Sequence, residues 1–537
     1  MKYRSTRGQA KDYSFEETVM TGLSPDGGLF IPHHIPVLPA NWRQNWSKLS
    51  FQELAVEILS LFIDESEMPR SDLKDLVQRS YATFRHEEVT PLAKIRDGLY
   101  VLELFHGPTF AFKDVALQFV GNLFEYFLER RNRQDTSGNT HRLTVVGATS
   151  GDTGSAAIYG LRNKKNVSVF ILHPHGRVSP IQEAQMTTVL DKNVHNLSVE
   201  GTFDDCQDIV KNLFGNKEFN SRHHLGAVNS INWARILAQT VYYFNAYFTL
   251  LRQLNIDPAS SEADQVNFDF SVPTGNFGDI LAGYYAYRMG LPTNKLIVAT
   301  NENDILYRFF ESSAYEKQTG ADGNVKETLS PAMDILVSSN FERLLWYLAR
   351  DAEKDGGKAE IASVDTALNE QLCDEAGQTV ATWMQQLKEQ GSFKVSNDVV
   401  LNARKIFDAA MVTDKETLDT IREFYDKPGQ TSYVLDPHTS VGVTAAEQVT
   451  KRDQLVAYPK GKEIMVCLAT AHPAKFSEAV ETALKTVSGF DFQKDVLPKE
   501  FHGLLDKERK VVPVERADPN LVMEVIEREL RGEGIEF

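Results

Sequence analysis

The stretch L-T-V-V-G-A-T-S-G-D-T-G-S-A-A-I-Y-G-L, residues 143–161, joins a short β-branched run, a glycine-rich turn and a helical pattern of apolar residues. Further β-rich runs lie at 167–172, 194–199, 268–272 and 296–300, each followed by turn residues or helical spacing. Strands that alternate with helices predict a parallel sheet covered by helices. The sequence therefore belongs to the α/β class.

The chain is longer than one hydrophobic core usually serves, so more than one domain is expected from its 537 residues. The start mixes turn signals with helical stretches, and the strand–helix alternation begins near residue 98. We expect four segments: an N-terminal region (1–97), an α/β domain (98–270), a second α/β domain (271–485) and a C-terminal tail (486–537).

The composition shifts within the second of these domains, at about residues 350–400. Residues 351–360 are charged and contain glycine, which is typical of an exposed insertion or a linker. Helical spacing follows at 368–388. The strand pattern then returns, and we expect strands near 433–435 and 464–468.

Composition and charge exclude several classes of partner. A net charge of −17 argues against binding to nucleic acid or to an anionic membrane. The cysteines Cys206, Cys373 and Cys467 are widely separated and lack metal-ligand spacing, which favours a reducing compartment. Neither a secretory signal pattern nor a membrane-spanning apolar run is visible. We expect a cytosolic protein without a metal, a nucleic-acid ligand or a membrane partner.

One lysine, Lys113, lies in an unusually apolar context. It ends the run H-G-P-T-F-A-F-K, and further apolar residues follow it. Burial among apolar groups disfavours an ammonium, so the pKa should fall and a free amine become accessible. Such an amine can form a Schiff base with an aldehyde such as pyridoxal phosphate (PLP). The alternative is a lysine whose stem lies on apolar surface while its ammonium reaches water, and by itself that is the commoner situation.

The turn at residues 147–154, G-A-T-S-G-D-T-G, opens a helix directly after a strand. Glycines let backbone amides converge there, and a helix N-terminus favours anions. The turn lacks the Lys-Ser/Thr pair of a Walker loop and the glycine spacing of a dinucleotide fingerprint. It also has more small hydroxyls than a plain turn capped by Asp152 or Thr153 requires, which favours ligand binding.

A second glycine-rich turn, P-T-G-N-F-G-D at residues 273–279, lies between another strand and helix. Its successive amides could bind a phosphate at the helix start. Alone this is a weak signal, but a Schiff-base lysine makes it specific, because PLP needs an anchor for its phosphate.

Two later segments, 435–442 and 467–476, place small polar residues after strands, where ligands of open α/β sheets bind. A hydroxyl there could hydrogen-bond the pyridine nitrogen of PLP. For His438 and His472, the alternative is that each residue only begins a helix.

Taken together, H-G-P-T-F-A-F-K-D, A-T-S-G-D-T-G, P-T-G-N-F-G-D and A-T-A-H-P-A-K-F, in this order, resemble the threonine synthase family. The family consists of fold type II PLP enzymes related to the tryptophan synthase β subunit. D-G-G-L at residues 26–29 is similar to its N-terminal element, and the likeness covers about residues 20–480. The likeness is to the longer branch of the family, which is found in fungi and many bacteria. The charged stretch around 350–400 departs from this likeness, because it matches no functional element of the family.

The resemblance implies two α/β domains with the active site between them, and roles for named residues. Lys113 would carry the Schiff base and afterwards transfer protons, and Thr470 would face the pyridine nitrogen of PLP. The cofactor phosphate would lie on Gly275, Asn276, Phe277, Gly278 and Asp279. The substrate carboxylate would be held by Thr149, Ser150, Gly151, Asp152 and Thr153. The implied reaction converts O-phospho-L-homoserine and water to L-threonine and phosphate, by a monomer or homodimer.

The substrate phosphate needs cations of its own in an acidic protein. Asn232 and Arg235 are three residues apart, which would place them on one helical face. Arg177, with Ser179, forms a second candidate pair. An arginine can bind phosphate through two parallel hydrogen bonds. The alternative for each arginine is a surface ion pair of little energetic weight.

Three other functions compete with this one. Another fold type II lyase, such as a threonine or serine dehydratase, is disfavoured by Asp152, because dehydratases commonly carry asparagine there. A non-catalytic relative that binds PLP or a phospho-ligand is disfavoured by the retention of Lys113 and both glycine-rich loops. A nucleotide-binding α/β module is disfavoured by the missing fingerprints.

Overall fold

The computed structural model describes residues 1–318, 325–352, 366–426, 432–454 and 462–537, and its strands form two main sheets. The larger sheet has the order β13-β10-β9-β14-β4-β3. All of its neighbouring strands are parallel except the pair β3–β4. Its strands are β3 (Leu92–Arg96), β4 (Leu99–Glu103), β9 (Val266–Pro273), β10 (Lys295–Thr300), β13 (Phe407–Met411) and β14 (Lys462–Ala469).

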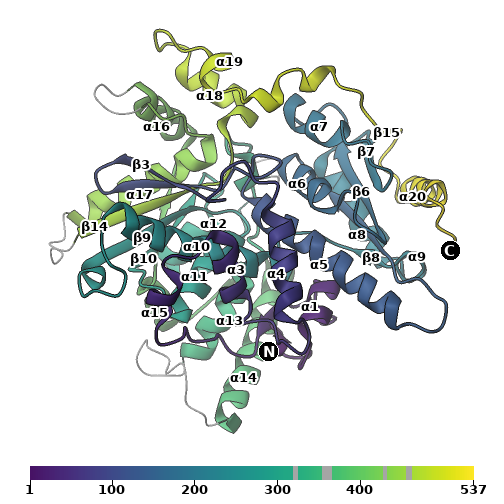
Figure 1. Cartoon of the computed structure of the whole chain (residues 1–537), viewed down its shortest axis with the longest axis horizontal. Helices are drawn as coiled ribbons and strands as arrows, with labels where there is room; N and C mark the ends of the chain where they lie inside the picture. Colours follow the sequence, from purple (N-terminus) through teal and green to yellow (C-terminus); the bar gives the residue numbers. More distant parts are fainter. Residues whose placement is uncertain (319–324, 353–365, 427–431, 455–461) are drawn as a thin grey trace.

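The smaller sheet is parallel throughout and has the order β15-β7-β6-β5-β8. Its strands are β5 (Leu143–Ala148), β6 (Val167–Pro174), β7 (Val194–Val199), β8 (Leu225–Gly226) and β15 (Val512–Val514). Figure 1 shows β6, β7 and β8 on the right of the molecule and β9, β10 and β14 on the left. The expected α/β class with parallel sheets is thus confirmed.

The sheets do not follow the linear boundaries expected from the sequence. β3 and β4, at the end of the N-terminal region and the start of the first domain, belong to the larger sheet. The expected C-terminal tail supplies β15 to the smaller sheet and ends in α20 (Pro519–Glu533), which packs on α8 (Phe203–Gly215). The domain boundaries themselves stay a prediction.

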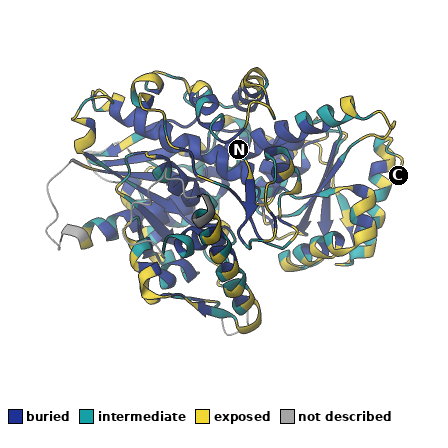
Figure 2. Cartoon of the chain, turned by 90° about the horizontal axis from the view of Figure 1, so that it is seen from below, coloured by how far each residue is buried: buried dark blue, intermediate teal, exposed yellow. Residues whose placement is uncertain are grey.

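Helices cover both faces of each sheet. On the larger sheet, α17 (Pro437–Gln454) packs on one face, and α11 (Gly278–Met289) and α12 (Ile305–Ser312) also contact its strands. On the smaller sheet, α8 packs against β5 and β6, and α6 (Asp152–Leu161) contacts β6. Figure 2 shows buried strands and helices enclosed by outer helices with exposed faces.

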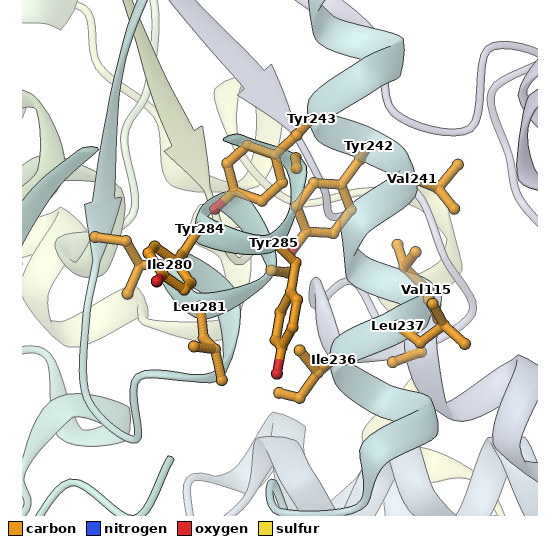
Figure 3. Packing of buried hydrophobic residues seen from close by; sticks show 14 of the residues in the cluster. Val115, Ile236, Leu237, Val241, Tyr242, Tyr243, Ile280, Leu281, Tyr284 and Tyr285 are labelled. Atoms are coloured by element: carbon orange, nitrogen blue, oxygen red, sulfur yellow. The ribbon is translucent and has the colours of Figure 1, made fainter. Parts of the chain in front are cut away.

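The centre of the molecule is α10 (Trp233–Gln253), which is buried from Trp233 to Leu251. It packs against α5 (Lys113–Gln134) and α11. Apolar and aromatic side chains occur all around this helix, as expected for one that is covered on every side. Figure 3 shows Tyr242 and Tyr243 on α10 beside Ile280 and Tyr284 of α11. This packing holds the starts of α5 and α11 in one rigid core.

The N-terminal region adds a small antiparallel sheet and helices to this core. The sheet consists of β1 (Tyr3–Ser5) and β2 (Phe30–Pro32). Its helices are α1 (Phe15–Thr21), α2 (Trp42–Trp46), α3 (Phe51–Leu59) and α4 (Arg70–Tyr81), and α4 packs on α5. Arg343 of α13 (Phe341–Ala352) is fully buried and donates to the carbonyl of Phe30, which joins β2 of this region to α13.

One expected strand is wrong. Residues 433–435 form an extended segment with no strand partner, although Leu435 is buried. Short apolar runs look alike whether they pair in a sheet or only pack beneath a helix. The expected helix at 368–388 is confirmed by α14 (Thr366–Gln390), whereas most of the charged stretch 351–360 lies outside the described residues. No described helix is long and apolar enough to cross a membrane.

Candidate active site

A cavity of about 650 Å³ opens at the carboxyl ends of β5, β9 and β14. Parallel α/β sheets bind their ligands at this edge, because the loops and helix N-termini converge there. Its wall combines the turns after these three strands with the first residue of α5, part of α10 and residues 331–337. Both main sheets therefore contribute to one site, as the resemblance implied.

Lys113, the first residue of α5, lines this cavity, and only 11% of its side chain is exposed. Burial lowers the pKa of its ammonium to about 8. The carboxylate of Asp152, 4.0 Å from the Lys113 Nζ, opposes that change, whereas the nearby cations of Lys475 and Arg235 reinforce it. The burial of Lys113 agrees with the apolar context of its sequence.

The loop before Lys113 is held by Asp114. Its buried carboxylate accepts hydrogen bonds from the backbone amide and the hydroxyl of Thr109, both at 2.8 Å. A Cβ on Gly107 would lie 2.4 Å from the Cβ of Asp114, so only glycine fits that position. These contacts explain the local pattern of the sequence H-G-P-T-F-A-F-K-D and fix the start of α5.

The turn after β5 brings Thr149, Ser150, Asp152 and Thr153 to the cavity wall, whereas Gly151 is not among the lining residues. The Thr149 hydroxyl accepts from the amides of Gly151 and Gly154, at 2.9 and 2.8 Å. The Thr149 hydroxyl therefore stabilises the turn itself. Binding of the substrate carboxylate by this turn stays a prediction.

Asp152 is buried, and its carboxylate interacts with two polar side chains. Its Oδ1 lies 2.6 Å from the Lys475 Nζ and accepts from the Gln182 side-chain amide at 2.8 Å. Burial opposes ionisation of this carboxyl, but the cations of Lys475 and Lys113 hold its pKa well below the usual range. Sequence reasoning assigned no role to Lys475. The sequence feature that could have indicated it is a lysine among small and apolar residues after a strand. A similar apolar context drew attention to Lys113.

The turn after β9 is built to receive an anion. No described residue accepts a hydrogen bond from the backbone amides of Gly275, Asn276, Phe277 or Gly278. These amides lie at the N-terminus of α11, whose cap residue Phe277 has φ +62° and makes no capping hydrogen bond. All four residues line the cavity. Converging free amides and a helix N-terminus fit the phosphate of PLP.

Asp279 faces the aromatic wall behind this turn. Its carboxyl accepts hydrogen bonds from the hydroxyls of Tyr242 and Tyr243. Burial raises its pKa to about 7, although the two tyrosine hydrogen bonds act in the opposite direction. A carboxyl with a raised pKa is tolerated beside a phosphate better than a fixed negative charge. Of Asp279, only the backbone amide is suited to the predicted phosphate contact.

Thr470 follows β14 and lines the cavity close to the Lys113 loop. Its carbonyl accepts from the amide of Phe112 at 2.8 Å, and Ala111 and Ala471 form a β-bridge beside it. No described residue hydrogen-bonds the Thr470 hydroxyl, so that group is available to a ligand. Nearby, His472 accepts from the amide of Ala474 and caps a short helix, which supports its structural interpretation.

Of the residues predicted for the substrate phosphate, only Arg235 lines the cavity. It is 3% exposed, and its Nη1 donates to the Val228 carbonyl at 3.0 Å while its Nε has no partner. Burial lowers its pKa to about 10. The expected pairing of Asn232 with Arg235 on one helical face is wrong, because Asn232 caps α10 and bonds Ala234 and Val19. Arg177 is exposed and outside the cavity wall.

Several lining residues were not assigned a role from the sequence. His438 was left undecided there, and it lies at the cavity with its Nδ1 2.9 Å from Asp436. Its Nε2 accepts from the Ala332 amide at 3.2 Å and so holds residues 331–337 against the site. The polar residues that sequence reasoning missed are Gln182, Asp204, Gln207, Asn229, Ser230, Gln239 and Asp334. In the described part of the chain, no cluster of His, Cys, Asp and Glu is suited to a metal.

Known families match most of the chain. The model of pyridoxal-phosphate-dependent enzymes matches residues 83–356. Those of the threonine synthase N-terminus and C-terminal region match 2–81 and 439–526. A threonine synthase of Schizosaccharomyces pombe is 52% identical over 99% of both chains.

Solved structures agree with the sequence matches. The crystal structure of threonine synthase from yeast is 53% identical and covers 99% of both chains, with a TM-score of 0.88. PLP-bound threonine synthase from Brucella melitensis is 40% identical, covers 99% of this chain and 100% of its own, and has a TM-score of 0.83.

Fold, cavity and comparisons together define a PLP-dependent enzyme of fold type II, with a buried lysine and an anion-binding turn at the same cavity. The cofactor is PLP, and the enzyme is a lyase. More narrowly, the chain belongs to the threonine synthase family.

Replacing Gly275 by alanine is expected to weaken PLP binding. The new Cβ would lie 2.9 Å from the Ala332 carbonyl oxygen and 3.2 Å from the Met333 Cα, so backbone must move. The displaced turn would lose a hydrogen bond to the charged phosphate, which costs about 1.5–3 kcal/mol and corresponds to a roughly ten- to hundredfold weaker affinity. Fluorescence titration of the apoenzyme with PLP measures it. Gly532→Ala, whose Cβ meets nothing within 4 Å, is the control. Equal affinities for both variants would place the cofactor phosphate elsewhere.

Proposed function

We propose that this cavity converts O-phospho-L-homoserine and water to L-threonine and inorganic phosphate. The observation that carries the proposal is the presence of two separate anion-binding features beside one low-pKa lysine. The free amides of the turn after β9 are suited to the cofactor phosphate. Arg235 has a free Nε, and no described carboxylate pairs with it, so it is suited to a second phosphate.

Lys113 is the proposed proton carrier of the reaction. With a pKa of about 8, its amine is partly neutral near neutral pH and can accept a proton. The reaction requires proton removal at Cα and at Cβ, loss of the γ-phosphate and addition of water at Cβ. PLP, when bound, acts as the electron sink for the negative charge at carbon. The protein then has to position groups and exchange protons.

The other lining residues would orient the substrate. Ser150 and Thr153, with the amides of their turn, are proposed to hold its carboxylate. Arg235 would hold the leaving phosphate and stabilise its growing charge. The hydroxyl of Thr470 is proposed to contact the pyridine nitrogen. A hydroxyl there, rather than a carboxylate, leaves that nitrogen less firmly protonated.

The oligomeric state and the cellular compartment are also part of the proposal. We infer a monomer or a homodimer, because residues of one chain supply both anion-binding features and the lysine. A cytosolic location is supported by three buried free thiols, Cys206, Cys373 and Cys467. Light scattering of the purified protein measures the oligomeric state.

The decisive experiment is an assay of phosphate release and threonine formation from O-phospho-L-homoserine. Phosphoserine and threonine serve as control substrates. We expect equal amounts of both products from phosphohomoserine and little turnover of the controls. Turnover of threonine to ammonia and a 2-oxo acid would instead identify a dehydratase. Binding of PLP with no turnover of any of the three would identify a non-catalytic relative.

Borohydride reduction of the PLP-loaded enzyme should fix the cofactor on Lys113. This amine combines a lowered pKa with a place in the cavity wall, so it is the nucleophile of choice. Peptide mapping by mass spectrometry identifies the modified residue. Lys164 also has a pKa lowered by burial but does not line the cavity, so it serves as an internal control. An adduct on Lys164 or any other lysine would overturn the assignment.

A further inference from the structure

Lys475 is a buried cation directly behind the cavity wall. Its side chain is fully buried, and its Nζ lies 2.6 Å from Asp152 Oδ1 and donates to the Thr109 carbonyl at 2.9 Å. It is not itself among the residues that line the cavity. Asp152 Oδ2 faces the other way and lies 4.0 Å from the Lys113 Nζ. One carboxylate thus lies between two lysines, and Lys475 is its closer partner.

The other charged groups near Lys113 do not replace Lys475 as the close partner of the Asp152 carboxylate. Asp114 accepts from Thr109 with both oxygens, and burial raises its pKa to about 6. Arg235 acts on Lys113 as a second cation. His472, the titratable neighbour of Lys475, is neutral near pH 7 because burial lowers its pKa to about 4. Among the residues that the structure describes, only Lys475 forms an ion pair with Asp152 at hydrogen-bonding distance.

We propose that Lys475 is a positioning residue for Lys113, which it serves by pairing with Asp152 so that this carboxylate does not trap Lys113 as an ammonium. The proposal rests on the proposed role of Lys113 as the cofactor-binding lysine. Lys475 also connects three loops. It lies in the loop after β14, donates to the loop before Lys113 and pairs with the turn after β5.

The charge balance predicts the sign of the effect. An opposite charge close to a lysine favours its ammonium form and raises its pKa. If Lys475 loses its charge, Asp152 has only Lys113 as a cationic partner. The Lys113 pKa should then rise by roughly one to two units. Because only the neutral amine attacks the cofactor, capture of PLP at pH 7 should slow by about ten- to hundredfold.

The test measures how fast the apoenzyme forms its covalent bond to PLP between pH 6 and pH 10, followed by absorbance. For the unaltered enzyme, the rate should rise through a midpoint of about 8. Lys475→Gln keeps a donor for Thr109 but no charge, so its midpoint should move upward. Lys475→Arg retains a cation, so its midpoint should stay close to that of the unaltered enzyme. If Lys475→Gln does not fold, Lys475→Met carries the same prediction.

A double variant separates charge from structure. Lys475→Gln combined with Asp152→Asn removes both members of the pair, so its midpoint should return to about 8 or below. A merely structural role for Lys475 predicts that the double variant is at least as impaired as the single one, and that result would overturn the inference. An unchanged midpoint in Lys475→Gln would also overturn it. An adduct on a lysine other than Lys113 would instead refute the proposed function.

Discussion

Replacing Lys113 by alanine should lower kcat for threonine formation by at least about a thousandfold. Proton transfer by one well-placed group contributes about 10²–10⁴-fold to an enzymatic rate, and Lys113 is also the proposed covalent anchor of the cofactor. The variant should still bind PLP, because the free amides after β9 do not depend on this side chain. Phosphate release measures the turnover, and absorbance of the cofactor measures its content.

Lys164→Ala is the matched control for this loss. Lys164 is also partly buried with a lowered pKa, and its Nζ donates to Asn122 away from the cavity. Its removal should leave kcat within about twofold of the unaltered enzyme, as for most substitutions outside a functional site. Should Lys113→Ala retain a tenth or more of the original kcat, another residue must carry the protons.

Local sequence patterns predicted the parts of the site that depend on chain neighbours. The runs at 143–146 and 268–272 form strands, and each is followed by a turn that opens a helix, as expected. Lys113 is buried as its apolar neighbours indicated. These features follow from residue types within a few positions of one another, because strand, turn and helix preferences act locally.

Features that join distant segments were not predictable in this way. The Asp152–Lys475 pair depends on how two loops from different sheets meet, and neither loop specifies its partner. The same holds for β4, which pairs with β14 although strands β5 to β8 of the smaller sheet lie between them in the chain. Spacing alone suggested that Asn232 acts with Arg235, but a cap residue lies outside the helical geometry on which that argument relied.

The contrast between Arg177 and Arg235 shows why burial matters to the choice of a phosphate ligand. Both arginines occur near the start of a helix, and the sequence offered no decisive difference between them. In the structure Arg177 is exposed, where its attraction for an anion is screened by water and salt. Arg235 is buried at the cavity, and the same charge acts there at lower effective dielectric.

Arg235→Ala should therefore lower kcat/KM for O-phospho-L-homoserine by roughly ten- to hundredfold. That corresponds to about 1.5–3 kcal/mol for loss of a charged hydrogen bond in the transition state. Arg177→Ala should leave kcat/KM unchanged. The spectral response of the enzyme to an amino acid without phosphate should be preserved in both variants. Arg235→Lys should recover only part of the loss, because an ammonium cannot form two parallel hydrogen bonds.

Two outcomes would relocate the substrate phosphate or the role of Arg235. If Arg235→Ala weakens PLP binding and impairs the response to phosphate-free amino acids equally, Arg235 serves the cofactor phosphate and not the substrate. If kcat/KM is unchanged, the cation for the leaving group is not Arg235. The Val228 carbonyl loses a donor in Arg235→Ala, so thermal unfolding of the variant must be compared with that of the unaltered enzyme. A specific defect at an unchanged Tm then isolates the contribution of the guanidinium to phosphate binding.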